Sequence, residues 1–178
     1  MDLSGSWSYI EGIAKERLRN NKTSRHVADY GTDIEILGAA GEIAARRFLG
    51  LPEKLHTHFD KGTDIRFAGR KIDVKATRLT NKVEYRCLQW PYQKPIRSNI
   101  ILLTAVSIPI RTAVVIGYAR KVEILRAPVN LERAYPCHEI SVKELHPASK
   151  LLTLANEPFL SKTQAFSGVK HNFPSSET

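Results

Sequence analysis

The sequence predicts a single domain of the α/β (α+β) class. Apolar residues recur every three or four positions along residues 7–19 and 33–49, which is the helical period. They alternate with polar residues along 65–74 and are nearly continuous along 99–106 and 112–119, which are two patterns typical of strands. A chain of 178 residues is long enough for one ordinary domain and too short for two.

The composition indicates a basic protein that stays inside the cell. Lys and Arg number 27 against 18 Asp and Glu, a formal charge of +9 that favours a polyanionic partner such as nucleic acid. Two cysteines without CxxC spacing are too few for a disulfide framework. No apolar run approaches the roughly 18 residues of a membrane span, and the N-terminus lacks a secretion signal. We therefore expect a cytoplasmic protein with no membrane partner.

Residues 1–32 are predicted to form an accessory helix and a basic linker. The helix covers residues 7–19, and its buried face is expected to carry Trp7, Ile10, Ala14 and Leu18. Residues 20–30 are polar and basic, which indicates a solvated linker, with a phosphate-contacting arm as the alternative.

The main domain, residues 33–155, is expected to begin with a helix that ends where Gly50 and Pro52 supply a C-cap and a breaker. Many small residues would let this helix lie close to a sheet. Glu42 lies on its buried side, where a lone carboxylate is costly unless a cation meets it. The alternative is a surface ion pair between Glu42 and Arg46, one turn further along the helix.

Residues 53–60 have the alternation of a first strand, with His56 and His58 on one face. No further Cys or His follows at ligand spacing, so an ordinary polar strand face is the main interpretation and a zinc site the alternative.

Residues 63–77 are predicted to form the tight hairpin on which the chemistry depends. Apolar and polar side chains take opposite faces: Ile65, Phe67, Ile72 and Val74 on one, and Asp64, Arg66, Asp73 and Lys75 on the other. Gly69 and Arg70 suit a two-residue type II′ turn, which places Asp64 opposite Lys75 and Arg66 opposite Asp73. Facing side chains stand roughly 5 Å apart, so both aspartates would reach a common cation with Lys75 beside it.

The remaining segments complete the sheet and its flanks. Residues 82–97 mix aromatic and basic side chains, and their prolines indicate a strand followed by a loop. The aromatics either form the rim of a nucleic-acid site or pack on the core. Residues 99–106 and 112–119 are expected to pair as buried strands. We further expect a helix over 120–125, a capping box at 141–144, a last helix over 147–155 and a flexible tail over 156–178.

The order of these residues resembles the PD-(D/E)xK, or restriction-endonuclease-like, nuclease superfamily. Glu42 in GAAGEIAARRFLG resembles the acidic residue on the family's first helix, and Asp64 in GTDI resembles its aspartate at the head of the second strand. Asp73 and Lys75 in IDVKAT resemble its acid-x-Lys element. The resemblance covers about residues 36–119 and extends to small phage- and mobile-element-type members. It implies a restriction-endonuclease-like core, a helix followed by a mixed four- to five-stranded sheet flanked by helices.

The residue types indicate the chemistry. A divalent cation lowers the barrier to phosphodiester hydrolysis by neutralising the phosphate and acidifying a bound water. Mg²⁺ prefers oxygen ligands and keeps several waters, so Asp64 and Asp73 would supply its carboxylates while Glu42 assists from the helix. The resemblance implies the Val74 carbonyl as a further ligand. Lys75 would orient the attacking water and stabilise the transition state.

We therefore expect a Mg²⁺-dependent nuclease, a phosphodiester hydrolase acting on DNA as an endonuclease, in which Mn²⁺ can substitute for Mg²⁺. Two alternatives keep the same fold: a non-catalytic nucleic-acid-binding or assembly protein, and a Holliday junction resolvase, which would require a homodimer. The residues expected to contact DNA are Arg66, Lys71, Arg78, Lys82, Arg86, Trp90, Lys94 and Arg97.

Overall fold

The computed structural model describes residues 1–20, 26–57, 62–79 and 87–154. The helices are α1 (Trp7–Asn20), α2 (His26–Phe48), α3 (Lys121–Arg126) and α4 (Ser149–Thr153). The strands are β1 (Ile65–Phe67), β2 (Arg70–Arg78), β3 (Cys87–Pro91), β4 (Ile100–Ser107), β5 (Thr112–Arg120), β6 (Val129–Asn130), β7 (Cys137–Ser141) and β8 (His146–Pro147).

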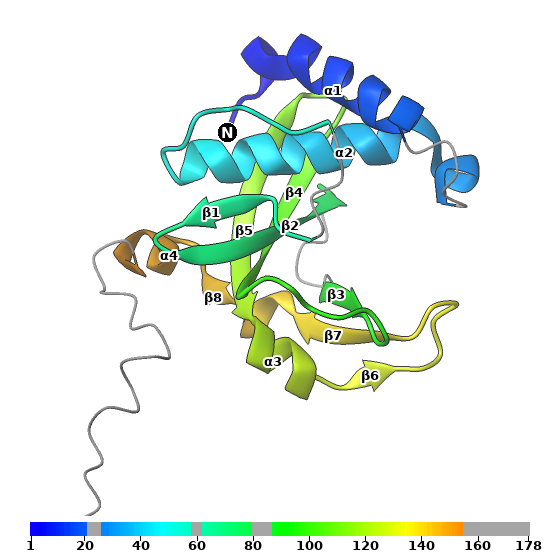
Figure 1. The fold of residues 1–178 in the computed structure, drawn as a ribbon, viewed down its shortest axis with the longest axis vertical. Coiled ribbons are helices and arrows are strands. Elements are labelled where there is room, and N and C mark those ends of the chain that lie inside the picture. Colours follow the sequence, from blue (N-terminus) through cyan, green and yellow to red (C-terminus); the bar gives the residue numbers. More distant parts are fainter. Residues whose placement is uncertain (21–25, 58–61, 80–86, 155–178) are drawn as a thin grey trace, which may run out of the picture.

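The strands form two sheets (Figure 1). The larger sheet has five strands in the order β1-β2-β4-β5-β8 and is mixed, because β2 and β4 run parallel while the other neighbours are antiparallel. α2 covers one face of this sheet, α1 lies on the outer side of α2, and the smaller β3-β7-β6 sheet lies on the opposite side. The predicted mixed sheet flanked by helices is confirmed, whereas the smaller sheet is an addition that the sequence pattern does not predict.

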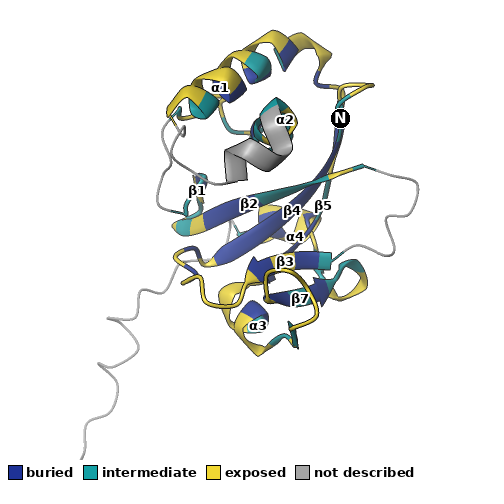
Figure 2. Cartoon of the chain, turned by 90° about the vertical axis from the view of Figure 1, so that its right-hand side faces the viewer, coloured by how far each residue is buried: buried dark blue, intermediate teal, exposed yellow. Residues whose placement is uncertain are grey.

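β4 is buried on both faces because each face meets a different layer. Ile100 and Leu102 pack in one cluster with Ala45 of α2, and Ile101 and Leu103 pack in another with Trp90 of the smaller sheet. Figure 2 shows β4 as buried between these layers. The predicted hairpin of β4 and β5 is confirmed by their antiparallel pairing.

α1 and α2 share an apolar cluster that holds the N-terminal helix on the domain. Ile10 and Ile13 of α1 pack with Ala40 and Ile43 of α2. The predicted helix over 7–19 is therefore confirmed. α2 begins at His26, so the described part of the predicted linker, residues 26–30, is helical instead.

Gly41 lets α2 lie directly on the sheet. A Cβ at this position would stand 2.5 Å from Thr104 Oγ1 and 2.7 Å from the Ala76 Cβ, both of which are impossibly close. The small-residue pattern thus predicts the close approach correctly. α2 ends as predicted too, since Gly50 adopts a positive φ of 67° just after the helix.

The β1–β2 hairpin forms in a register that differs from the prediction by two residues. Ile65 pairs with Ile72, and the turn residues are Ala68 and Gly69. Their φ angles of 48° and 72° suit a type I′ turn, in which both central residues have positive φ. The predicted turn at Gly69 and Arg70 is therefore wrong.

The corrected register changes which charged residues face each other. Arg66 faces Lys71 instead of Asp73. Asp64 precedes the paired residues, and its backbone N–H donates to the Ile72 carbonyl, so Asp64 does not lie opposite Lys75 as predicted. Because strand side chains alternate with a period of two, a shift of two residues leaves every side chain on its predicted face.

The remaining predictions have mixed outcomes. The short helix near 120–125 is confirmed as α3, and α4 is shorter than the predicted last helix. The predicted capping box is confirmed at Ser141, which opens a 3₁₀ turn over Val142–Glu144. The predicted strand over 53–60 is wrong for its described part, because residues 53–57 form no strand. The predicted tail lies outside the described residues. No helix in the described ranges is long and apolar enough to cross a membrane.

Candidate active site

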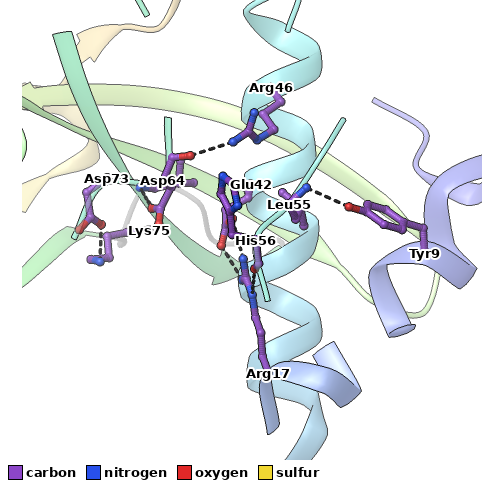
Figure 3. Close-up of polar contacts among 10 residues, drawn as sticks. Tyr9, Arg17, Glu42, Arg46, Leu55, His56, Asp64, Asp73 and Lys75 are labelled. Atoms are coloured by element: carbon purple, nitrogen blue, oxygen red, sulfur yellow. Dashed lines mark hydrogen bonds and ion pairs between the residues drawn. The ribbon is translucent and has the colours of Figure 1, made fainter. Parts of the chain in front are cut away.

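One cavity of about 440 Å³ collects the residues to which the sequence assigns chemistry. It lies between α2, the segment before β1 and the middle of β2, and α1 reaches it from outside (Figure 3). Its lining includes Glu42, Asp64, Asp73, Val74 and Lys75. The fold thus brings together every predicted catalytic and metal-binding residue.

Glu42 approaches the cavity from α2 and is held by a cation from α1. Its side chain is only 11% exposed, and its two carboxylate oxygens accept hydrogen bonds from Arg17 Nη1 and Nη2 at 2.6 and 2.9 Å. Arg46, the alternative partner, donates instead to the Asp64 carbonyl at 2.9 Å. A cation therefore meets the buried carboxylate, as its burial requires, but that cation comes from a different helix.

Asp64 lies where β1 separates from β2. Its backbone N–H donates to the Ile72 carbonyl at 2.9 Å, and its Oδ2 accepts the Val74 N–H at 2.6 Å. Burial, followed by the charges of Glu42 and Asp73, raises the pKa of Asp64 to about 7, against the lowering effects of the Val74 hydrogen bond and Lys75. Burial is thus the main reason that the ionised form of Asp64 is unfavourable, and the two neighbouring carboxylates add to it.

Asp73 and Lys75 lie two residues apart on β2 and contact each other within the strand. Asp73 is 2% exposed, and Lys75 Nζ donates to its Oδ1. The ammonium also lies 4.9 Å from the centre of the Trp90 ring. The predicted cross-strand pair of Asp64 with Lys75 is thus replaced by a pair within one strand, because of the register shift.

Trp90 connects two lysines at the cavity. Lys94 lines the cavity, and its Nζ lies 5.5 Å from the Trp90 ring centre. Trp90 Nε1 donates to the Lys94 carbonyl at 2.8 Å. The Trp90 ring has no face free to stack on a base, because the residue is 2% exposed, and this corrects its predicted contact with DNA. Of the two interpretations of the aromatics, packing on the core holds for Trp90.

Two charged residues of the cavity are missing from the sequence prediction, Arg17 and Glu35. Glu35 lies two helical turns before Glu42 on α2, and burial raises its pKa, with Arg17 opposing and Glu42 reinforcing the shift. Arg17 follows Ile13 and Ala14 at helical spacing on the buried side of α1. The signal that indicates both is the helical period, which places them in line with the buried faces of their helices.

The oxygen donors around the cavity suit a hard divalent cation such as Mg²⁺. Asp64 and Asp73 supply carboxylates, and the Val74 carbonyl should point to the same side of β2 as its N–H, toward Asp64. Within the described ranges, no three or more His, Cys, Asp or Glu side chains are already spaced to hold a metal ion. Because Arg17 and Lys75 contact Glu42 and Asp73, both would have to shift to admit a cation.

Of the two histidines predicted as an alternative zinc site, His56 lines this cavity. The His56 carbonyl accepts a hydrogen bond from Arg17 Nε at 3.0 Å. His58 lies outside the described residues.

The other described residues predicted to contact DNA lie on exposed surface. Arg66 and Lys71 face each other across the hairpin and are both exposed. Arg78, at the end of β2, is paired with Asp33 at 3.1 Å, and Arg97 is exposed in the loop before β4. Lys82 and Arg86 lie outside the described residues.

Comparison of the chain with protein-family models, curated proteins and solved structures finds no match.

Proposed function

We propose that this chain is a Mg²⁺-dependent endonuclease that hydrolyses phosphodiester bonds in DNA. The observation that carries the proposal is the convergence of Glu42, Asp64 and Asp73, from three separate segments, on one cavity with Lys75. These four residues also carry the resemblance to PD-(D/E)xK nucleases, whose restriction-endonuclease-like core is part of the proposal. The formal charge of +9 adds a general attraction to a polyanion.

The electrostatics of the cavity support a functional role for the acids. A buried carboxylate beside two others is unfavourable, and the raised pKa of Asp64 expresses that cost. Strongly shifted acids in a cleft are typical of functional sites, since stability alone would favour a smaller charge. A divalent cation beside Asp64 would favour its ionised form.

Each residue has a role that follows from its position. Asp64, Asp73 and the Val74 carbonyl would hold the cation, and Glu42 would bind a water of its shell. When bound, the cation would neutralise the phosphate and acidify a water. Lys75, a third exposed and held between Asp73 and Trp90, would stabilise the negative charge that develops on the phosphate.

The test is nicking of supercoiled plasmid with Mg²⁺, with and without EDTA. Asp73→Asn and Lys75→Ala should each reduce cleavage by about 100-fold or more, because each removes a charge at the reacting phosphate. The control is Lys143→Ala, which removes an exposed lysine from the 3₁₀ turn outside the cavity and should cleave like wild type. Unchanged Mg²⁺-dependent cleavage in either site variant would refute this site.

The same assay separates the alternatives. DNA binding without cleavage at any Mg²⁺ or Mn²⁺ concentration would favour the non-catalytic nucleic-acid-binding or assembly protein. Preferential cleavage of four-way junctions by a dimer, measured together with sedimentation, would favour the junction resolvase.

A further inference from the structure

Arg17 is a cation built into the wall of the cavity. Its side chain is 14% exposed, and it lies one turn beyond Ile13 and Ala14, the last buried residues of α1. The apolar packing of α1 on α2 therefore fixes the position on α1 from which the Arg17 side chain extends. Three hydrogen bonds hold it, two to the Glu42 carboxylate and one to the His56 carbonyl.

The charges around Arg17 include two carboxylates of the proposed cation site, Glu42 and Asp64. Burial works against its charge, yet the hydrogen bonds and charge of Glu42, with smaller effects of Asp64 and Glu35, keep the pKa of Arg17 above its ordinary value. Both oxygens of Glu42 are occupied by this one guanidinium. A divalent cation that recruits Glu42 must therefore compete with Arg17 for the same carboxylate.

We propose that Arg17 is a further substrate-binding residue, which holds Glu42 until a divalent cation binds there and then binds the phosphate of the DNA. This inference rests on the proposed function. The planar fork of a guanidinium matches a carboxylate and a phosphate alike, because both present paired oxygens, so the same donors serve both partners. Arg17 lines the same cavity as Asp64, Asp73 and Lys75, so the transfer would take place within one site.

The first measurement is Mn²⁺ binding by titration calorimetry without DNA. Arg17→Gln removes the competitor for Glu42, so Mn²⁺ should bind about fivefold or more tightly than to wild type. Arg17→Lys should give a smaller increase, since an ammonium cannot bind both carboxylate oxygens in the same way. Lys15→Gln, at an exposed position of the same helix, is the matched control and should leave Mn²⁺ affinity unchanged.

The second measurement is binding of a short DNA duplex in Ca²⁺, used in place of Mg²⁺ to suppress cleavage. Arg17→Gln should weaken this binding about fivefold or more, because a phosphate contact is lost. Opposite changes in the two affinities are the signature of the transfer. Unchanged or weaker Mn²⁺ affinity, or unchanged DNA affinity, would overturn the inference.

Two further variants keep the test decisive. In Glu42→Gln, the added Arg17→Gln change should no longer affect Mn²⁺ affinity but should still weaken DNA binding; a persisting effect on Mn²⁺ would contradict the competition. If Arg17→Gln alone fails to fold, Arg17→Lys and this neutral double variant carry both measurements.

Asp73→Asn separates the two proposals. If Mn²⁺ binding is absent in wild type or unchanged in Asp73→Asn, the proposed function fails. If Asp73→Asn weakens Mn²⁺ binding and Arg17→Gln changes nothing, only the role of Arg17 fails.

Discussion

The Asp64 carboxylate accepts the Val74 backbone N–H at 2.6 Å, at the point where β1 no longer pairs with β2. A side-chain oxygen thus replaces the backbone carbonyl that a longer β1 would have supplied. Because β1 begins only at Ile65, this edge of β2 is open to the cavity at Val74. The same hydrogen bond holds Asp64 beside Asp73 and Glu42, which the pKa of Asp64 reflects.

Asp64→Asn should be more stable than wild type at pH 8 but about equal to it at pH 4. The pKa of Asp64 is about 7 in the folded state, against 3.8 as its ordinary value. Between these values the folded protein binds the extra proton, so wild-type stability falls as pH rises through about 7. The upper limit of the difference is roughly 4 kcal/mol. Urea unfolding in EDTA at both pH values measures it, and a pH-independent difference would contradict the prediction.

Gly41→Ala should destabilise the protein by roughly 1–3 kcal/mol, because the new methyl group collides with Thr104 and Ala76. α2 would have to move away from the sheet and carry Glu42 with it, so plasmid cleavage should fall as well. The control is Gly12→Ala on α1, where a Cβ meets nothing within 4 Å. That change should stabilise by up to about 1 kcal/mol through helix propensity. Thermal unfolding and nicking assays on both variants test this, and equal effects would count against close packing of α2.

Trp90→Leu should reduce kcat about tenfold, since the aromatic face under the Lys75 ammonium is lost. Trp90→Phe keeps an aromatic face but loses the N–H bond to the Lys94 carbonyl, so its kcat should lie closer to wild type. Single-turnover cleavage rates compare the two variants. Tyr92→Leu, at an exposed position one residue beyond β3, should leave kcat unchanged. If the Phe and Leu variants cleave equally slowly, the ring does not position Lys75.

Local patterns in the sequence predict much of this fold. The helical period located α1 and most of α2, and the continuous apolar run located β4, because each pattern records which faces of one element are buried. The same patterns indicate the four residues assigned to the cavity, since Glu42 lies on the buried side of a helix and the other three on the polar face of a hairpin, and these residues carry the family resemblance.

Contacts between distant segments are what the sequence patterns miss. Arg17 and Glu42 are 25 residues apart, and neither helix pattern indicates that the two side chains meet. Pairing of β3 with β7 likewise depends on tertiary packing, since about 50 residues separate Gln89 from Glu139. The hairpin register failed for a different reason: alternation fixes a register only to within two residues, so the turn residues decide it.

The turn itself can therefore be tested. Ala68→Asn should stabilise the protein by about 0.5–1 kcal/mol, because Ala68 has a φ of 48° and Asn tolerates this region better than Ala. Arg70→Asn should destabilise it, since Arg70 belongs to β2, pairs with Phe67 and donates to the Leu154 carbonyl at 3.1 Å. If Gly69 and Arg70 formed the turn, the two effects would be reversed, because Asn is favoured in turns and disfavoured in strands. Urea unfolding of the two variants distinguishes the registers, and with them whether Arg66 lies opposite Lys71 or opposite Asp73.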